Sequence, residues 1–315
     1  MSDGCLIVGL GTPKSPAPED IRDFLKPFLS DPYVVDFPRW LWKPILNQIV
    51  LRVRPKKVAP EYQAIWTKAG SPLEVYTLAQ RAALEAELRK DHPDVVVGHA
   101  MTYTEPSIAQ AIAEMNVDNL VLIPLYPQYA PSTVADIMRQ AREYCAQSGA
   151  PKLTIVDPWY DLDSYIAWHA TRIKEELATG SYDKIIMSYH GVPERAVHEP
   201  ASYRAQCERT THAIMERVGD IPYEMTFQSK FGPGKWLGPA TIDRMAELPG
   251  EGARNILLLT PGFFADCIET LQEIDSQNQE VFKAAGGVEF RRIAPPNADA
   301  TAGQMLADIY RDAVA

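Results

Sequence analysis

A histidine and a row of carboxylates are the residues best suited to chemistry in this sequence. His190 follows an apolar run at 184–187 and is followed directly by a Gly-Val-Pro turn. Ligands of α/β proteins bind at the carboxyl ends of strands, and an imidazole can act as a base or as a metal ligand near neutral pH. A well-bonded loop histidine would give the same local pattern, so both interpretations remain open at this point.

The carboxylates are Asp266, Glu269 and Glu273, whose i, i+3 and i+7 spacing puts them on one face of an α-helix predicted to begin at Asp266. The first two have the spacing of a capping box, and acids in a first turn favour the helix dipole. Glu273 lies beyond the first turn, so capping does not explain it. A line of carboxylates is what a cation path or a proton relay needs, and oxygen ligands suit a divalent metal ion.

The elements that position these residues are short apolar runs, typical of strands covered on both faces, and amphipathic segments typical of helices. Strands are predicted at 5–8, 95–97, 120–125, 151–156, 184–187, 222–227 and 255–259, and helices at 19–30, 73–90, 162–178, 202–218 and 301–313. Segments 120–137 and 255–274 share one plan of strand, proline, aromatic loop and helix. We therefore expect an α/β fold with two Rossmann-like lobes, whose parallel sheets face each other across a cleft.

The predicted lobe boundaries follow from this plan. Residues 1–150 form the N-terminal lobe, with the helix at 301–315 packing back on it, and residues 151–300 form the lobe that carries His190 and Glu269.

An apolar segment at about 36–55 contains Trp40, Trp42 and Ile45 and is flanked by basic residues. A core helix is the ordinary explanation of such a segment. The alternative is an exposed lip that admits an apolar ligand or rests on a bilayer surface. The two tryptophans favour this alternative, because indole side chains prefer interfaces.

The first strand runs into Gly9 and Gly11, which looks at first like a dinucleotide-binding turn. The third glycine of that fingerprint is missing, and prolines follow where a helix should begin at once. A glycine-rich turn that lets the backbone approach a flat ligand explains these residues equally well.

Composition excludes several classes of function. Of the 315 residues, 46% are hydrophobic and 23% are charged, as in an ordinary globular protein. The net charge of −10 argues against binding to nucleic acid. The four cysteines form no CxxC pair, which fits a reducing compartment. No signal peptide and no apolar run of ~18 residues is recognisable, so we expect a cytoplasmic protein.

Ordered sequence blocks stand along the chain: Gly-Thr-Pro at 11–13, Gly-Ser-Pro at 70–72, Leu-Tyr-Pro-Gln-Tyr at 125–129, Ser-Tyr-His-Gly-Val-Pro at 188–193, Gln-Ser-Lys-Phe-Gly-Pro at 228–233, Trp-Leu-Gly-Pro at 236–239 and Pro-Gly-Phe-Phe-Ala-Asp-Cys-Ile-Glu-Thr-Leu at 261–271. With these blocks the chain resembles ferrochelatase of the bacterial type, the lyase that inserts ferrous iron into a porphyrin at the end of haem synthesis. The resemblance extends from about residue 6 to residue 282.

The resemblance implies roles for individual residues. His190 and Glu269 match the catalytic, iron-binding pair, expected on opposite walls and acting on opposite faces of a distorted macrocycle. Asp266 and Glu273 match the acidic path for protons or metal beside them. The residues expected to bind the porphyrin are Leu10, Ser71, Tyr126, Trp236 and Phe263, and those expected on the lip are Trp40, Trp42 and Ile45. Whether His190 accepts protons or binds iron stays open.

Two departures from the family pattern shape the expected chemistry. Some relatives carry a [2Fe–2S] cluster, but this chain has Pro131 in the matching loop and no cysteine after Cys267. We therefore expect no [2Fe–2S] cluster and no permanently bound cofactor, with Fe²⁺ acting as a substrate. Relatives that use coproporphyrin have a tyrosine where this chain has Leu10, which favours protoporphyrin IX.

Three alternatives are a coproporphyrin III iron chelatase, a cobalt or sirohydrochlorin chelatase of the same fold, and a non-enzymatic haem carrier. A more polar substrate does not explain the apolar lip, and a carrier has no use for the carboxylate line. The expected partners are protoporphyrin IX and Fe²⁺, together with either the inner face of the membrane or an upstream porphyrin-synthesis enzyme. No nucleic acid is expected.

Overall fold

The structure is a computed structural model that describes residues 2–194, 202–230 and 234–315. The chain forms two compact units. Unit 1 comprises Met1–Tyr126, Ala130–Asp157 and Pro296–Ala315, and unit 2 comprises Pro127–Tyr129 and Pro158–Pro295.

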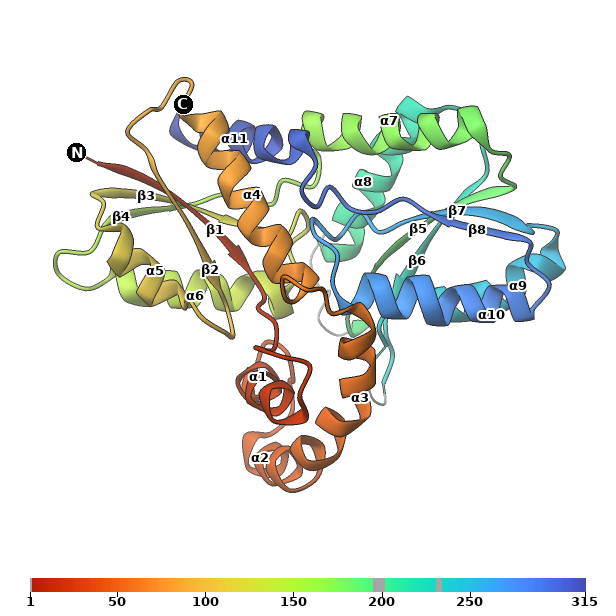
Figure 1. The fold of residues 1–315 in the computed structure, drawn as a ribbon, viewed down its shortest axis with the longest axis horizontal. Helices are drawn as coiled ribbons and strands as arrows, with labels where there is room; N and C mark the ends of the chain where they lie inside the picture. Colours follow the sequence, from red (N-terminus) through yellow and green to blue (C-terminus); the bar gives the residue numbers. More distant parts are fainter. Residues whose placement is uncertain (1, 195–201, 231–233) are drawn as a thin grey trace. The chain divides into compact units, whose positions relative to one another are not determined.

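The sheet of unit 1 has four parallel strands in the order β2-β1-β3-β4. The strands are β1 (Asp3–Gly9), β2 (Val96–Met101), β3 (Asn119–Pro124) and β4 (Lys152–Ile155). Helices α4 (Pro72–Leu88) and α11 (Ala300–Val314) cover one face, and α5 (Ile108–Met115) and α6 (Asp136–Cys145) cover the other (Figure 1). Because both faces are covered, the central strands are continuous apolar runs.

Helix α11 returns to unit 1 and packs along α4. A Cβ atom at Gly303 would lie 2.6 Å from the main-chain carbon of Ala83, closer than real side chains come. Glycine at this position therefore permits the close approach of the two helices.

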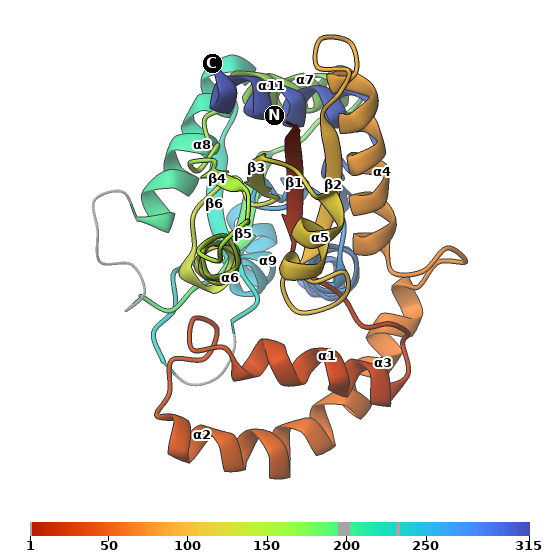
Figure 2. The same ribbon diagram turned by 90° about the vertical axis from the view of Figure 1, so that its left-hand side faces the viewer.

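A helical extension follows β1 in unit 1. It contains α1 (Pro18–Ser30), α2 (Arg39–Ile45), the π-helical segment η1 (Leu46–Val50) and α3 (Leu51–Ile65). Figure 2 shows α1, α2 and α3 beyond the end of the unit 1 sheet.

The sheet of unit 2 has four parallel strands in the order β6-β5-β7-β8. The strands are β5 (Lys184–His190), β6 (Tyr223–Gln228), β7 (Asn255–Leu259) and β8 (Glu289–Arg292). Helices α7 (Asp163–Thr179) and α8 (Tyr203–Val218) lie on one face, and α9 (Thr241–Glu247) and α10 (Gln279–Ala284) lie on the other (Figure 1).

The two sheets share one strand order. In each, the chain passes from a central strand to a neighbour on one side and then crosses to the other side. The crossing creates a topological switch point, between β1 and β3 in unit 1 and between β5 and β7 in unit 2. Ligands of such sheets bind outside the carboxyl ends of the strands at this point.

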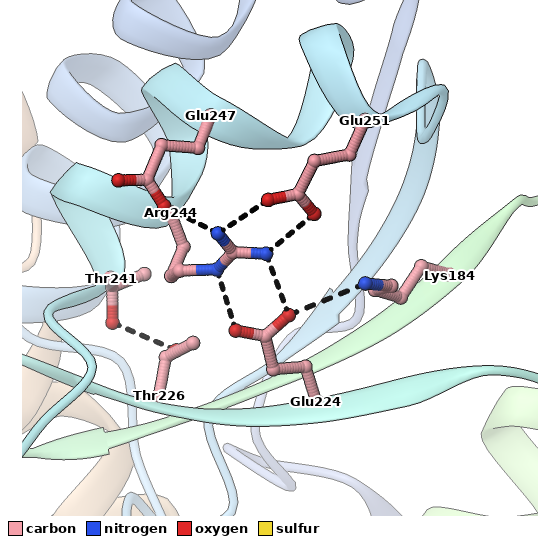
Figure 3. A network of polar contacts seen from close by, with 7 residues as sticks. All are labelled: Lys184, Glu224, Thr226, Thr241, Arg244, Glu247 and Glu251. Atoms are coloured by element: carbon pink, nitrogen blue, oxygen red, sulfur yellow. Dashed lines mark hydrogen bonds and ion pairs between the residues drawn. The ribbon is translucent and has the colours of Figure 1, made fainter.

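An arginine network holds the other end of the unit 2 sheet together (Figure 3). Arg244 of α9 donates to Glu224 of β6 at 2.6 Å and to Glu251, in the 3-10 turn η4 (Leu248–Glu251), at 2.8 Å. It also pairs with Glu247, and Lys184 reaches Glu224 at 3.4 Å. Both Lys184 and Glu224 stand near the amino ends of their strands, so the network lies away from the switch point.

The predicted fold class is confirmed: the chain has an α/β fold with two parallel sheets. Three expectations differ from the structure. The strand predicted at 151–156 was assigned to the second lobe, but β4 pairs with β3 in the sheet of unit 1, which therefore extends to Asp157. Strand β8 has no counterpart among the predictions, because Phe290 is its only apolar residue. The helix expected from Asp266 is instead the π-helix η5 (Glu269–Asn278), which begins three residues later.

The four cysteines are free thiols. Cys5, Cys207 and Cys267 are buried and Cys145 is half-buried. Burial raises the pKa of each thiol above its ordinary value.

None of the helices in the described parts of the chain combines the length and the apolar character that crossing a membrane requires.

Candidate active site

His190 is the last residue of β5 and stands at the switch point of unit 2. Its Nδ1 lies 2.7 Å from the carbonyl oxygen of Gly191. A carbonyl only accepts hydrogen bonds, so Nδ1 carries the proton and Nε2 keeps its lone pair. Tyr203 donates to the main-chain oxygen of His190 at 2.9 Å and fixes the backbone at this point. The imidazole is therefore oriented with Nε2 as its acceptor nitrogen.

Gly191 allows the chain after β5 to remain close to β6. Its N–H donates to the main-chain oxygen of Gln228 at 2.7 Å. A Cβ atom at position 191 would lie 2.6 Å from the same oxygen, so any side chain would push the two segments apart. Steric crowding thus explains why the residue after His190 is a glycine.

Gln228 ties the strand of the histidine to the helix of the glutamates. Its side chain is buried, accepts from Ser188 at 2.9 Å and donates to the main-chain oxygen of Glu269 at 3.0 Å. Gln228 was predicted only as part of a motif. Its position directly after the strand predicted at 222–227 was the signal that could have singled it out.

Glu273 is held by the residue that follows Gln228. Ser229 donates from its N–H to the Glu273 carboxylate at 2.6 Å, and its hydroxyl donates to the second carboxylate oxygen. Ser229 has φ of 64°, in the left-handed region that residues with a side chain rarely adopt. This unusual backbone turn aims both donors at one carboxylate.

Glu273 interacts electrostatically with both His190 and Glu269. Burial raises the pKa of Glu273, the hydrogen bonds from Ser229 and the charge of His190 work against that rise, and the charge of Glu269 adds to it. His190 and Glu269 are therefore both within electrostatic range of Glu273 in unit 2. His190 and Glu269 both belong to unit 2, and their action on opposite faces of a macrocycle stays a prediction.

Asp266 is engaged elsewhere. Its carboxylate accepts from Arg292 at 2.9 Å and from Thr270 at 2.7 Å, and it is almost completely buried. The expectation of three carboxylates on one α-helical face is therefore wrong, because Asp266 precedes the helix and the helix has π geometry.

No three His, Cys, Asp or Glu side chains converge into a ready-made metal centre anywhere in residues 2–194, 202–230 and 234–315. The groups at the switch point that could contact a metal ion are Nε2 of His190 and the carboxylates of Glu269 and Glu273.

Two aromatic residues lie beside His190. The ring of Phe263 is 6.5 Å from the imidazole, with 49° between the planes. Trp236 belongs to a segment that pairs with the chain just after His190, through the Pro193–Trp236 bridge and the 3.0 Å bond from Leu237 N–H to the Val192 oxygen.

A pocket of about 300 Å³ borders this segment and is lined by Gly191, Phe227, Gln228, Lys230, Lys235 and Trp236, among others. The motif residues at 231–233 lie outside the described part of the chain.

The predicted porphyrin contacts of unit 1 surround its own switch point. Leu10 follows β1 and is half-buried, and its carbonyl accepts from the N–H of Tyr103 at 3.0 Å. Tyr126 lies just after β3, half-buried against the core under α5 and α6. Ser71 is buried at the start of α4, and its hydroxyl accepts from Thr12 at 2.8 Å.

The lip residues divide into two kinds. Trp40 is 76% exposed and Ile45 is 37% exposed. Trp42 is buried, and its indole N–H donates to the main-chain oxygen of Leu29 at 2.7 Å. The expectation that both tryptophans belong to the exposed lip is wrong for Trp42, because residues two apart on a helix point to different sides.

A family model described as Ferrochelatase matches residues 2–314 of the chain. The chain is 44% identical over 312 residues to the coproporphyrin III ferrochelatase of Lactococcus lactis subsp. lactis, with 97% of this chain and 96% of the relative covered. It is 41% identical over 315 residues to ferrochelatase 2 of Shewanella oneidensis, with 98% and 96% covered.

Among solved structures, SirB from Bacillus subtilis with Fe³⁺ aligns with a TM-score of 0.59 at 13% identity and covers 100% of this chain and 96% of its own. CbiX, described as the terminal enzyme for sirohaem biosynthesis in denitrifying bacteria, aligns at 0.56 and 14% identity, with both chains covered completely. At these identities the likeness shows the fold alone. The family match over residues 2–314, together with relatives above 40% identity, shows that the chain belongs to the ferrochelatase family and is an enzyme that inserts metal into porphyrin.

Proposed function

We propose that the protein inserts Fe²⁺ into protoporphyrin IX, with His190 accepting the pyrrole protons and Glu269 receiving the iron. One observation carries the proposal: an imidazole whose Nδ1 proton is fixed on Gly191 stands at a topological switch point and interacts electrostatically with the half-buried carboxylate of Glu273.

The chemistry needs a base and a cation path. A free-base porphyrin loses two N–H protons as the metal enters, and a positioned imidazole is suited to accept them near neutral pH. Glu273 supports this role, because its carboxylate lies within electrostatic range of the imidazole that receives the protons. Imidazole and carboxylate are both suitable ligands for ferrous iron, so these side chains can also contact the incoming ion in passing.

Chemical rescue distinguishes the two roles of His190. We expect His190→Gly to lose iron insertion and to recover part of it when substituted imidazoles are added anaerobically. A recovered rate that rises with the pKa of the added imidazole supports proton transfer. A recovered rate that does not depend on that pKa would assign His190 to iron binding instead.

Leu10 supports protoporphyrin IX as the substrate, since relatives that use coproporphyrin have a tyrosine there. A specific observation favours a second candidate, coproporphyrin III, because the Lactococcus relatives at 44–45% identity and an Enterococcus faecalis relative at 39% carry that name. The two substrates differ in charge, since protoporphyrin IX has two vinyl groups where coproporphyrin III has two further propionates.

A direct comparison decides between them. Anaerobic Fe²⁺ is mixed with protoporphyrin IX, coproporphyrin III or sirohydrochlorin, and the Soret band is followed. We expect the highest kcat/KM with protoporphyrin IX, and we expect Leu10→Tyr to lower that preference. A higher kcat/KM with coproporphyrin III would show that coproporphyrin III is the substrate. If no porphyrin were turned over beyond one equivalent, the protein would be a non-enzymatic carrier.

We also propose that iron passes through the protein only as a substrate and that no [2Fe–2S] cluster is bound. Pro131 in the relevant loop and the absence of cysteine after Cys267 in the sequence support this. An iron–sulfur absorption band, with matching acid-labile sulfide, in the purified protein would contradict the proposal.

The exposed part of the lip supports a peripheral site of action at a membrane surface for an otherwise cytoplasmic protein. Trp40, Ile49 and Val53 are 76%, 58% and 61% exposed, and amphipathic helices with such side chains bind bilayer interfaces. We expect the protein to sediment with vesicles containing anionic lipid, and Trp40→Ala to weaken this binding. Equal sedimentation of the two proteins would instead favour contact with an upstream porphyrin-synthesis enzyme.

A further inference from the structure

A buried arginine bridges the segment that carries the two glutamates of the site. Arg292 is the last residue of β8, and only 8% of its side chain is exposed. Its Nη1 donates to Asp266 at 2.9 Å, and its Nε and Nη2 donate to Asp275 at 2.6 and 2.7 Å. Asp266 lies just before η5 and Asp275 lies within it, so a single guanidinium connects both sides of the stretch between them.

The double contact fits the π form of the helix. Asp266 precedes η5, so only the direction of Asp275, six positions after Glu269, depends on the period of the helix. Six positions take about 1.7 turns of an α-helix but only about 1.4 turns of a π-helix, which closes i→i+5 hydrogen bonds. An α-helical η5 would therefore turn Asp275 away from the arginine.

Arginine is the side chain suited to this bridge. Its planar guanidinium has five donors in a fixed fork, which allows paired bonds to one carboxylate and a further bond to another. A lysine would keep the positive charge but has a single nitrogen and no fork. Removing the charge altogether would leave the buried Asp266 carboxylate without its cation, which is strongly destabilising.

Contacts from β6 hold the other side of η5. The Gln228 side chain donates to the main-chain oxygen of Glu269, and Ser229 donates to the Glu273 carboxylate. Arg292 thus completes a set of contacts around η5 whose other members lie at the site itself.

We propose that Arg292 is a positioning residue, which holds η5 in its π form by bridging Asp266 and Asp275. The π form in turn sets the directions in which the two glutamates of η5 point. The inference rests on the proposed function only for what those glutamates do, and it assigns Arg292 no contact with porphyrin or iron.

The main test is Arg292→Lys, which preserves the charge and removes the fork. We expect kcat for iron insertion to fall about 10- to 100-fold, as a misplacement of about 1 Å in a reacting group predicts. The dissociation constant for porphyrin, measured by fluorescence quenching, should remain within twofold, because the aromatic contacts are unchanged.

Arg244→Lys is the matched control. Arg244 is also a poorly exposed arginine of unit 2 with several carboxylate partners, but its network lies at the amino ends of the strands (Figure 3). We expect its substitution to lower the melting temperature and to leave kcat near the wild-type value. An equal loss of kcat in both variants would mean that Arg292 acts through general stability, and would overturn the proposal.

Amide hydrogen exchange distinguishes a local positioning role of Arg292 from a general effect on stability. In Arg292→Lys, we expect faster exchange confined to the amides of residues 269–278, with those of α7 and α8 unchanged. Wild-type kcat or wild-type exchange in this segment would contradict the inference. Hydrogen exchange is measured without substrate, so it tests the positioning role of Arg292 independently of activity. A wild-type protein that inserts no iron would refute the proposed function and leave this test unaffected.

A second variant keeps the test decisive if Arg292→Lys does not fold. Asp275→Asn releases one end of the bridge while the buried Asp266–Arg292 pair stays intact, and Asp275 is itself 37% exposed. We expect a folded protein with a smaller loss of kcat and the same localised exchange. Wild-type values for both would reject the bridge as a positioning device.

Discussion

The two units share a strand order and differ in what stands at their switch points. In unit 1, the positions after β1 and β3 carry Leu10 and Tyr126. In unit 2, the positions around β5 and β7 carry His190 and Phe263, with Glu273 interacting electrostatically with the histidine. One sheet end therefore offers apolar and aromatic contact, and the other offers groups that exchange protons and bind cations.

This difference separates the contributions of topology and side chains. The strand order determines where a ligand can bind, because the crossover leaves space outside the same strand ends in both units. The side chains decide what happens to the ligand there. Substitutions at equivalent positions of the two units should therefore have different kinds of effect.

The largest expected difference is between His190→Ala and Leu10→Ala. Loss of a general base typically costs 10²- to 10⁴-fold in rate, so we expect iron insertion by His190→Ala to fall by about this factor. Leu10→Ala removes apolar contact, so we expect a higher KM and a kcat within about threefold of wild type. Steady-state kinetics with saturating Fe²⁺ measure both, and an equal loss of kcat in the two variants would break the comparison.

Acid should weaken unit 2 through His169 of α7. This side chain is buried, and its ring centroid lies 4.6 Å from that of Tyr165 and 4.9 Å from that of Trp168. Neither imidazole nitrogen of His169 has a hydrogen-bond partner among the described residues. Burial lowers the pKa of His169 to about 3. The unfolded chain takes up the proton at an ordinary pKa near 6.5, so stability falls as the pH drops from about 6.5 towards 3.

From these two pKa values, we expect His169 to lower the free energy of unfolding by about 3 kcal/mol at pH 4.5 relative to neutral pH. His169→Leu should remove that loss, as measured by urea unfolding at pH 7.5 and 4.5 with hydrogen exchange in α7. The exposed His212 provides the control, since His212→Ala should leave the pH dependence unchanged. The same acid sensitivity in His169→Leu as in wild type would exclude this residue as the cause.

Two glycines make a smaller and more local comparison. Gly191→Ala and Gly303→Ala each place a Cβ atom 2.6 Å from main-chain atoms, of Gln228 and Ala83 respectively. Such crowding typically costs about 1–3 kcal/mol, so both should lower the melting temperature. Only Gly191→Ala should also lower kcat, because it displaces the segment that fixes His190. A lower kcat in Gly303→Ala would contradict the separation of the units' roles.

The smallest effect lies within unit 1. Trp42→Phe removes the hydrogen bond to Leu29, which should cost about 1 kcal/mol of unfolding free energy. Trp40→Phe changes only an exposed ring and should stay within about 0.5 kcal/mol of wild type. Urea unfolding of both variants measures this, and equal costs would remove the distinction between the buried and the exposed tryptophan.

Periodicity and short apolar runs sufficed to predict the fold class. The central strands β1, β3, β5 and β7 are covered on both faces, so each reads as an uninterrupted apolar run. Strand β8 lies at an edge with Phe290 as its only apolar residue, and this pattern gives no such signal. The edge strand was therefore missed together with Arg292, its last residue.

The site was only partly predictable for a related reason. The positions of His190 and Glu273 follow from local sequence, since one ends a strand and the other lies beyond the first turn of a predicted helix. The π geometry of η5 depends on partners far along the chain, such as Ser229 and Arg292. Sequence spacing alone predicts an α-helix for the segment. It therefore places Asp266 on the same face as Glu269 and Glu273, whereas in the structure Asp266 pairs with Arg292.

The four cysteines, of which three are buried and Cys145 is half-buried, have a practical consequence. Thiolates, and not thiols, react with alkylating reagents, and the raised pKa of Cys5, Cys145, Cys207 and Cys267 keeps each protonated at neutral pH. We therefore expect the native cysteines to react only slowly with maleimide reagents. One exposed cysteine introduced into each unit would take up a pair of fluorophores selectively, and energy transfer between them would report how the two units move when a porphyrin enters.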